Sequence, residues 1–291
     1  MEQGSTVPRR QLGRYLKEAR ERADITVRAA AAALDWSTPR LWRVETGQVA
    51  VRASDVDSAC RLYGVNEELS DALQALARET KARGWWHSYG DAVPDWFSLF
   101  VGLEAAASRL RQYGTALVPG LLQTRAYMYE VIGLDHPGMD ADDRYKRVAV
   151  KLERQALLSR ALPPAPTLDV ILSESVLRRP VPDRAVMAEQ LRHMVVAGER
   201  FNVSVRILPF DAGLHRGSVV GSFAILDYPQ STPHPEPSTV YIEGATGALY
   251  HDRPAEIEAY EAIWASVANL ALSEAESRVM IAAAAEDWES R

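Results

Sequence analysis

The sequence predicts a mainly helical protein with a mixed sheet, an α+β fold in two domains: residues 1–83 as five short helices and residues 84–291 as helices around the sheet. Three observations predict it. Apolar residues recur at helical spacing through most of the first 80 residues. From residue 168 onward, apolar segments of strand length alternate with segments of helical spacing. Between these parts the composition changes at Gly84-Trp85-Trp86-His87, where two adjacent tryptophans are expected to anchor one domain against the other.

The composition is that of a globular protein with a buried core, since 47% of the 291 residues are apolar and 25% are charged. No apolar run approaches the roughly 18 residues that a membrane span needs, and the N-terminus lacks the apolar segment of a secretory signal. The single cysteine, Cys60, excludes an internal disulfide framework and a zinc site built from several cysteines. We therefore expect a cytoplasmic protein.

The charge is divided unevenly along the chain. Residues 1–52 carry 10 basic and 6 acidic side chains, a net charge of +4, whereas residues 85–291 carry 19 and 27, a net charge of −8. A small basic segment on an acidic body is typical of a protein in which only one domain meets nucleic-acid phosphate. The net charge of −6 for the whole chain argues against a protein that coats nucleic acid along its entire surface.

Five helices are predicted in the first domain, each with its apolar residues three or four positions apart on one face. They are expected over residues 10–22, 29–34, 38–45, 56–63 and 69–76. Thr26 and Ser37 are suited to cap the N-termini of the second and third helices. Gly47 and Gly64 are suited to end the third and fourth.

The second and third helices are separated only by Asp35-Trp36-Ser37. Two short helices joined by such a turn form a helix-turn-helix, whose second helix lies in the major groove of DNA. The stretch ITVRAAAAALDWSTPRLWRVETG resembles the helix-turn-helix of the XRE (lambda-repressor/Cro-like) family. The matching residues are Ile25, Thr26, Ala31, Leu34, Ser37, Leu41, Arg43, Glu45 and Gly47. This resemblance implies a sequence-specific DNA-binding transcriptional regulator, associated with the nucleoid when it is bound to DNA.

Two positions depart from the family pattern. Asp35 stands where the family has a turn glycine, and Asp adopts the left-handed conformation more easily than most residues. Val27 stands where the family has a glutamine that often touches the DNA backbone, a contact that valine cannot make. The resemblance also implies that Glu45 pairs with an arginine of the first helix, for which Arg14 is the expected partner.

The outward face of the third helix follows from its apolar positions, Leu41 and Val44. Arg40 and Arg43 are expected to reach guanine or phosphate, and Thr38 a base edge or a thymine methyl. Trp42 either contacts thymine methyls and sugars or packs between helices. Arg9 and Arg10 form either a flexible arm that reaches the DNA backbone or a solvated terminus. The full set of expected DNA-binding residues is Thr26, Arg28, Thr38, Pro39, Arg40, Trp42, Arg43, Arg9 and Arg10.

The second domain is expected to begin with three helices, which run through about Tyr113, through about Ile132 and over residues 142–161. Strands over residues 168–172 and 203–207, with a helix over about 184–199 between them, predict a right-handed parallel βαβ unit. Further strands are expected over residues 222–228 and 239–243. A helix from Ile257 to Val267 and a last helix opened by the capping box Ser273-x-x-Glu276 complete the domain.

Several segments of this domain resemble the C-terminal domain of the WhiJ-like, antitoxin-like XRE regulators of actinomycetes. They include residues 118–124, 172–179, 189–193, 205–210 and 272–277. The resemblance implies that the domain binds a small partner protein encoded nearby, which modulates DNA binding. The alternative is a one-component regulator whose C-terminal domain senses a small-molecule ligand.

Neither a catalytic motif nor a nucleotide-binding motif occurs in the sequence, so we expect no enzyme and no cofactor. Two histidines and two carboxylates could converge on a metal, but without ligand spacing they are better interpreted as surface or hydrogen-bonded polar residues. These residues are His215, Glu243, His251 and Asp252. Trp85, Trp86 and Trp96 either line a small-molecule pocket or form domain-anchoring core.

We also expect a homodimer, held mainly by the C-terminal domain. A single helix-turn-helix reads only a few base pairs, and such proteins bind half-sites about 34 Å apart. The junction between the domains, residues 78–86, is expected to set how a partner on one domain changes DNA binding by the other.

Overall fold

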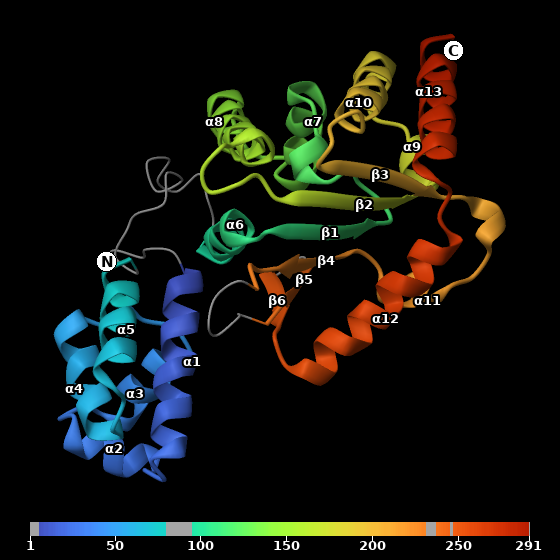
Figure 1. Cartoon of the computed structure of the whole chain (residues 1–291). Helices are drawn as coiled ribbons and strands as arrows, with labels where there is room; N and C mark the ends of the chain where they lie inside the picture. Colours follow the sequence, from blue (N-terminus) through green and yellow to red (C-terminus); the bar gives the residue numbers. More distant parts are fainter. Residues whose placement is uncertain (1–5, 80–94, 231–236, 245–246, 291) are drawn as a thin grey trace. The chain divides into compact units, whose positions relative to one another are not determined.

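A computed structural model describes residues 6–79, 95–230, 237–244 and 247–290 (Figure 1). Its contacts divide the chain into two compact units, which are described separately. The first holds the N-terminal helices together with residues 98–106, and the second holds the chain from residue 107 onward with a short preceding segment. The expected fold class, helices with a mixed sheet, is confirmed. No helix within the described ranges is long and apolar enough to cross a membrane.

The five predicted helices of the first unit are all present. They are α1 (Thr6–Arg22), α2 (Val27–Ala33), α3 (Thr38–Glu45), α4 (Ala53–Tyr63) and α5 (Glu67–Glu79). Their apolar faces meet in one core, to which every helix contributes. The most deeply buried members include Leu12, Leu16, Ala30, Leu41, Val56 and Leu73.

The expected capping residues fix the helix-turn-helix. The Thr26 hydroxyl accepts a hydrogen bond from the Ala29 amide at 3.2 Å, and the Ser37 hydroxyl accepts one from the Arg40 amide at 3.3 Å. Between the helices, Asp35 has φ +55°, the left-handed conformation expected where the family has glycine. The short turn therefore fixes the direction in which α3 leaves α2.

The second unit is built on a six-stranded sheet in the order β3-β2-β1-β4-β5-β6. Its strands are β1 (Arg109–Gly114), β2 (Thr167–Ser173), β3 (Val203–Leu208), β4 (Phe223–Asp227), β5 (Thr239–Gly244) and β6 (Gly247–His251). The first three strands are parallel, and the last three join antiparallel. The expected parallel pairing of the strands around residues 170 and 205 is confirmed.

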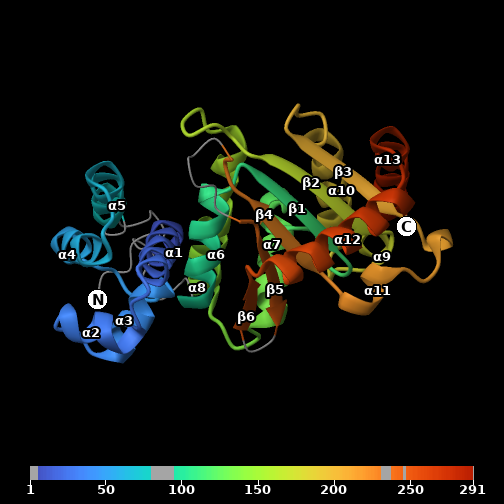
Figure 2. The ribbon, with the colours of Figure 1, turned by 60° about the horizontal axis from the view of Figure 1, so that its bottom comes forward.

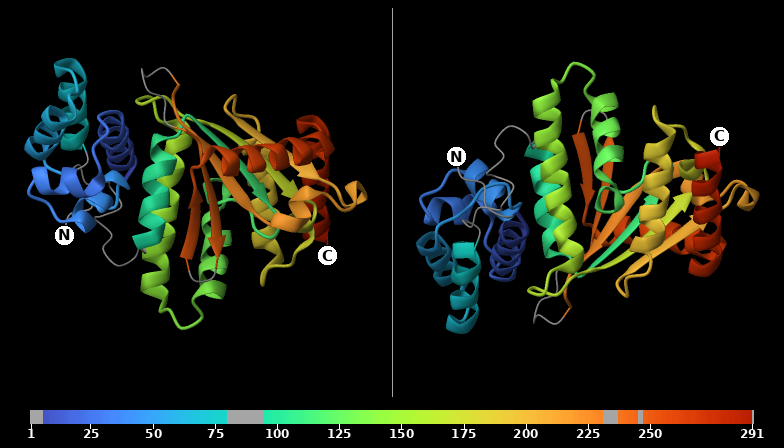
Figure 3. Two further views of the ribbon diagram at one scale, coloured as in Figure 1. Left: turned by 90° about the horizontal axis from the view of Figure 1, so that it is seen from below. Right: turned by 90° about the horizontal axis from the view of Figure 1, so that it is seen from above.

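Helices cover both faces of this sheet, as Figures 1 to 3 show. On one face lie α7 (Arg125–Asp135), α8 (Ala141–Arg154), α10 (Arg184–Ala197) and α13 (Glu274–Ser290). On the other lie α11 (Arg216–Val220) and α12 (Pro254–Leu270), which crosses the strands (Figure 2). The short helix α9 (Ser175–Arg178) also belongs to this unit, whereas most of α6 (Asp95–Ala106) belongs to the first unit. The α12 side of the core joins Tyr113, Ile171, Phe223, Ile225, Val240, Ile263 and Val267.

The prediction of a helix through about Tyr113 is wrong, because α6 ends at Ala106 and residues 109–114 form the central strand β1. Both arginines of β1 find acidic partners far along the chain: Arg109 lies 2.6 Å from Asp169, and Arg111 lies 2.7 Å from Asp227. These ion pairs join residues that are far apart in the chain, so the local sequence around β1 contains no pattern that predicts them. The helix expected over residues 142–161 is α8, which continues as a 3₁₀ turn over Gln155–Ser159.

Candidate nucleic-acid interface

Helix α3 lies close to α1 at one glycine. A Cβ atom placed on Gly13 would lie 2.3 Å from the Val44 carbonyl oxygen and 2.7 Å from that of Glu45. A side chain at this position would therefore force the two helices apart. Glycine lets the C-terminal end of α3 rest directly on the backbone of α1.

A buried ion pair holds the same two helices together. Arg20 Nε donates to Glu45 Oε1 at 2.6 Å, and Arg20 Nη2 donates to Glu45 Oε2 at 3.0 Å. A third hydrogen bond runs from Arg20 Nη1 to the Ile25 carbonyl oxygen at 2.9 Å, so the same side chain also fixes the loop that leads into α2. The hydrogen bond to Glu45, more than any other cause, raises the pKa of Arg20. This bidentate pair fixes the orientation of α3.

The expectation that Arg14 pairs with Glu45 is therefore wrong, because Arg20 occupies both carboxylate oxygens. The reason lies in the helical period of α1. Gly13 marks the face of α1 that touches α3, and Arg20 is seven residues further on, about two full turns and so on the same face. Arg14 is one residue from Gly13 and points about 100° away from that face.

The outward face of α3 presents polar and aromatic side chains to solvent. Leu41, Val44 and Glu45 are buried, whereas the remaining residues of the helix are exposed. The exposed set is Thr38, Pro39, Arg40, Trp42 and Arg43. Trp42 is 54% exposed, so the alternative that it packs between helices is wrong. Thr26 and Arg28, at the start of α2, are also exposed.

Arg40 is held in place by two neighbours. Its Nη2 atom lies 2.9 Å from Asp55 Oδ2 on α4, and its guanidinium lies 4.5 Å from the centre of the Trp36 ring. An exposed ion pair of this kind contributes only about 0–1 kcal/mol, so DNA phosphate or a guanine edge can replace Asp55. Arg43 has a weaker constraint, a single hydrogen bond from Nε to the Pro39 carbonyl oxygen at 3.3 Å.

Arg9 and Arg10 form neither a flexible arm nor a solvated terminus, so both expectations are wrong. Both residues lie in α1. Arg9 is 4% exposed, and burial lowers its pKa. Arg10 is half-buried and packs against Gly47, whose Cβ would lie 2.6 Å from the Arg10 Cα atom. The extra turns at the start of α1 place both arginines within the folded unit.

Two further exposed residues follow α3 in the chain and were missed by the sequence reasoning. Gln48 follows α3 and is exposed. Arg52 is exposed at the start of α4, and its carbonyl oxygen accepts a hydrogen bond from the amide of Asp55, the partner of Arg40. The position of Arg52 at the end of the basic segment 1–52 is the one sequence signal that pointed to it.

The structure contradicts the metal hypothesis for the second unit. Among the described residues, no group of three or more histidine, cysteine, aspartate or glutamate side chains could hold a metal ion. His215 lies edge-on to the Tyr113 ring, and His251 Nδ1 lies 3.4 Å from Glu256. The tryptophan hypotheses concern Trp85 and Trp86, which lie outside the described residues, and Trp96, whose side chain does as well.

The comparisons with known families agree with this geometry. Residues 97–283 match the family described as a domain of unknown function (DUF5753), which is more than half of the chain. The chain belongs to the DUF5753 family. Residues 11–73 of this DUF5753 protein match a helix-turn-helix domain, which supports a DNA-binding regulator. Neither the curated proteins nor the solved structures contain a match to the chain.

Proposed function

We propose that this DUF5753 protein is a sequence-specific transcriptional regulator that reads its operator with α3 in the major groove. The exposed face of α3 carries the proposal. Thr38, Arg40, Trp42 and Arg43 point outward together, while the opposite face is fixed on α1 by the buried Arg20–Glu45 pair. A helix whose reading face is presented rigidly in this way suits direct readout of base edges.

The residues of the surface divide by the contacts that they can make. Arg40 and Arg43 are proposed to bind guanine O6 and N7, and Thr38 a base edge. Trp42 is proposed to cover thymine methyls or sugars. Arg28 and Arg52 flank α3 and are proposed to bind phosphate, which sets the register without reading sequence.

The test is binding of an operator selected from genomic fragments, measured by fluorescence anisotropy with the full chain. Arg40→Ala and Arg43→Ala are each expected to weaken operator binding by about 1–3 kcal/mol, or roughly 5- to 150-fold. Arg61→Ala is the matched control, because Arg61 is an exposed arginine of α4 that pairs with Asp57 outside α3. Unchanged operator affinity for both α3 variants would remove α3 from the recognition role.

We further propose that the regulator acts as a homodimer, with the second unit providing most of the contact between copies. Two copies present two recognition helices, which fits half-sites about one helical turn of DNA apart. This arrangement gives the operator the two-fold symmetry of the protein.

We also propose that this protein belongs to the antitoxin-like, WhiJ-like regulators of actinomycetes. In this proposal, its second unit binds a small partner protein encoded nearby. An exposed apolar segment between β3 and β4 supports a protein partner over a small-molecule ligand. Phe210 is 59% exposed, Leu214 96% and Val219 87%. Several exposed apolar side chains within one short segment are typical of a protein-binding surface.

The partner proposal is tested by co-expression with the product of the neighbouring small reading frame. The two proteins are expected to co-purify, and Leu214→Asp is expected to abolish the complex. Leu134→Asp is the matched control, since Leu134 is an exposed leucine, 71% accessible, on α7 and outside this segment. Failure to co-purify, or equal loss in both variants, would contradict this assignment of the surface.

A further inference from the structure

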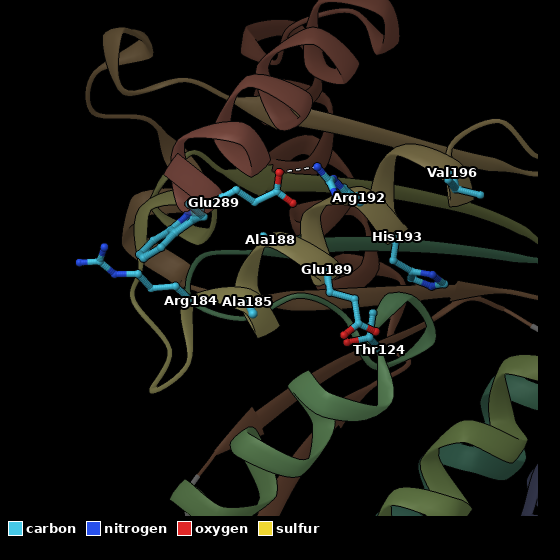
Figure 4. Close-up of a pocket in the computed structure, with 10 residues that line it drawn as sticks. Thr124, Arg184, Ala185, Ala188, Glu189, Arg192, His193, Val196 and Glu289 are labelled. Carbon is cyan, nitrogen blue, oxygen red and sulfur yellow. Dashed lines mark hydrogen bonds and ion pairs between the residues drawn. The ribbon is translucent and has the colours of Figure 1, made fainter. Parts of the chain in front are cut away.

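The outer face of α10 lines an open groove of about 650 Å³ (Figure 4). The inner face of the helix is buried in the core through Met187, Leu191 and Met194. The α13 side of the groove is formed by Trp288 and Glu289, and the α7 side by Thr124. Arg192 forms an ion pair with Glu289, which is drawn as a dashed line in Figure 4.

Four exposed residues of α10 follow one another along its outer face: Ala185, Glu189, Arg192 and Val196. Their spacing of four, three and four residues is that of the contact positions in a two-stranded coiled coil. The stripe is about 16 Å long, at a rise of 1.5 Å per residue. Val196 is 62% exposed, a large apolar side chain with no cover at one end of the stripe.

This stripe of four exposed residues is complementary to a second copy of itself in the antiparallel direction. In an antiparallel pair of these helices centred between Glu189 and Arg192, each Glu189 shares a layer with Arg192 of the other copy. Each Val196 then shares a layer with Ala185, whose small side chain leaves room for it. A parallel pair would instead place glutamate beside glutamate, and such like-charge contacts oppose association.

We propose that α10 is the contact between two copies of this chain, packed antiparallel across a two-fold axis. The inference rests on the proposed homodimer and names the surface that forms it. Two-fold symmetry forms the contact between Glu189 and Arg192 twice, once on each side of the axis. Arg192 is then flanked by Glu289 of its own chain and Glu189 of the second copy. The polar layers at the centre set the register and the antiparallel direction, while the apolar layers close the ends.

The test uses the full chain, charge reversal and mixing. Glu189→Arg places two arginines in each central layer, and Arg192→Glu places two glutamates there. Each variant alone is expected to raise the dimer dissociation constant at least about tenfold, because juxtaposed like charges oppose association. An equimolar mixture of the two variants is expected to dimerise again, because every central layer then holds one arginine and one glutamate. Glu258→Arg, on the opposite face of the sheet, is the control for charge reversal alone.

Sedimentation velocity separates the outcomes, and far-UV circular dichroism checks that each variant is folded. Recovery of the dimer in the mixture supports α10 as the contact. A wild-type dimer that Glu189→Arg leaves intact would overturn this surface and leave the proposed homodimer standing. Variants that weaken the dimer without recovery on mixing would also overturn it. A wild-type chain that stays monomeric at about 100 μM would overturn both proposals and leave the groove to a ligand or to another protein.

Discussion

Removing the arginine of the buried Arg20–Glu45 pair is expected to destabilise the first unit severely. The two side chains are 6% and 5% exposed, and Arg20 donates three hydrogen bonds, two to Glu45 and one to the Ile25 carbonyl. Arg20→Met keeps much of the apolar stem but leaves a buried carboxylate without a cation. Loss of one partner from a buried ion pair costs about 3–5 kcal/mol. The expected loss of unfolding free energy at pH 7 is therefore about 3–5 kcal/mol.

The size of this loss is expected to depend on pH. Protonating a glutamic acid with an ordinary pKa of about 4.3 costs about 3.7 kcal/mol at pH 7 and about 1 kcal/mol at pH 5. In the variant, the buried carboxyl of the native state holds a proton that the same carboxyl releases in the unfolded state. The unfolding free energy of the variant therefore rises as the pH falls. The difference from the wild type is expected to shrink by up to about 2–3 kcal/mol between pH 7 and pH 5.

The unfolding free energy of this unit is measured on the full chain in urea. Hydrogen exchange at the amides of α1 and α3 serves as the probe, because these amides belong to the first unit. The double variant Arg20→Met/Glu45→Leu is the matched control, because it replaces the pair with apolar side chains of similar size. It is expected to recover most of the lost stability or to exceed the wild type. A single variant that loses less than about 1 kcal/mol, or a double variant no more stable than Arg20→Met, would refute the reasoning.

Two further predictions concern the first unit. Asp55→Asn is expected to tighten DNA binding about two- to fivefold, because Arg40 is released from an ion pair that contributes up to about 1 kcal/mol. Fluorescence anisotropy measures the change, with Asp57→Asn as the control. Weaker DNA binding by Asp55→Asn would contradict the prediction. Cys60 is buried and burial raises its pKa, so its thiol is expected to react with Ellman's reagent at least about 100-fold more slowly in the native protein than in urea. Immediate reaction of the native protein would show that the core opens freely.

The sequence predicted the helix-turn-helix well because its determinants are local. Thr26 and Ser37 each bond an amide three residues away, and Asp35 supplies the turn conformation by itself. The apolar positions of α3 repeat within two turns. The same repeat predicted which residues of α3 are exposed. A pattern contained in so few residues is readable without knowledge of the rest of the chain.

The features that the sequence did not predict are those whose partners lie far away. β1 lies between β2 and β4, and its side chains Arg109 and Arg111 pair with Asp169 and Asp227. Arg14 and Arg20 both lie on the predicted first helix, and only the crossing of α1 with α3 at Gly13 selects Arg20. No local spacing encodes such a choice, because packing between elements decides it.

The order of the strands sets when each unit can fold during synthesis. Helices α1 to α5 are complete by residue 79, whereas β1 cannot pair with β4 until residue 227 has been made. At about 5–20 residues per second, the ribosome needs about 7–30 s to add the intervening chain. Throughout that interval a nascent chain holds helices α1 to α5 and lacks the strand β4 that pairs with β1 at the centre of the sheet. The five N-terminal helices are thus synthesised well before the sheet of the second unit can be completed, while the chain is still attached to its ribosome.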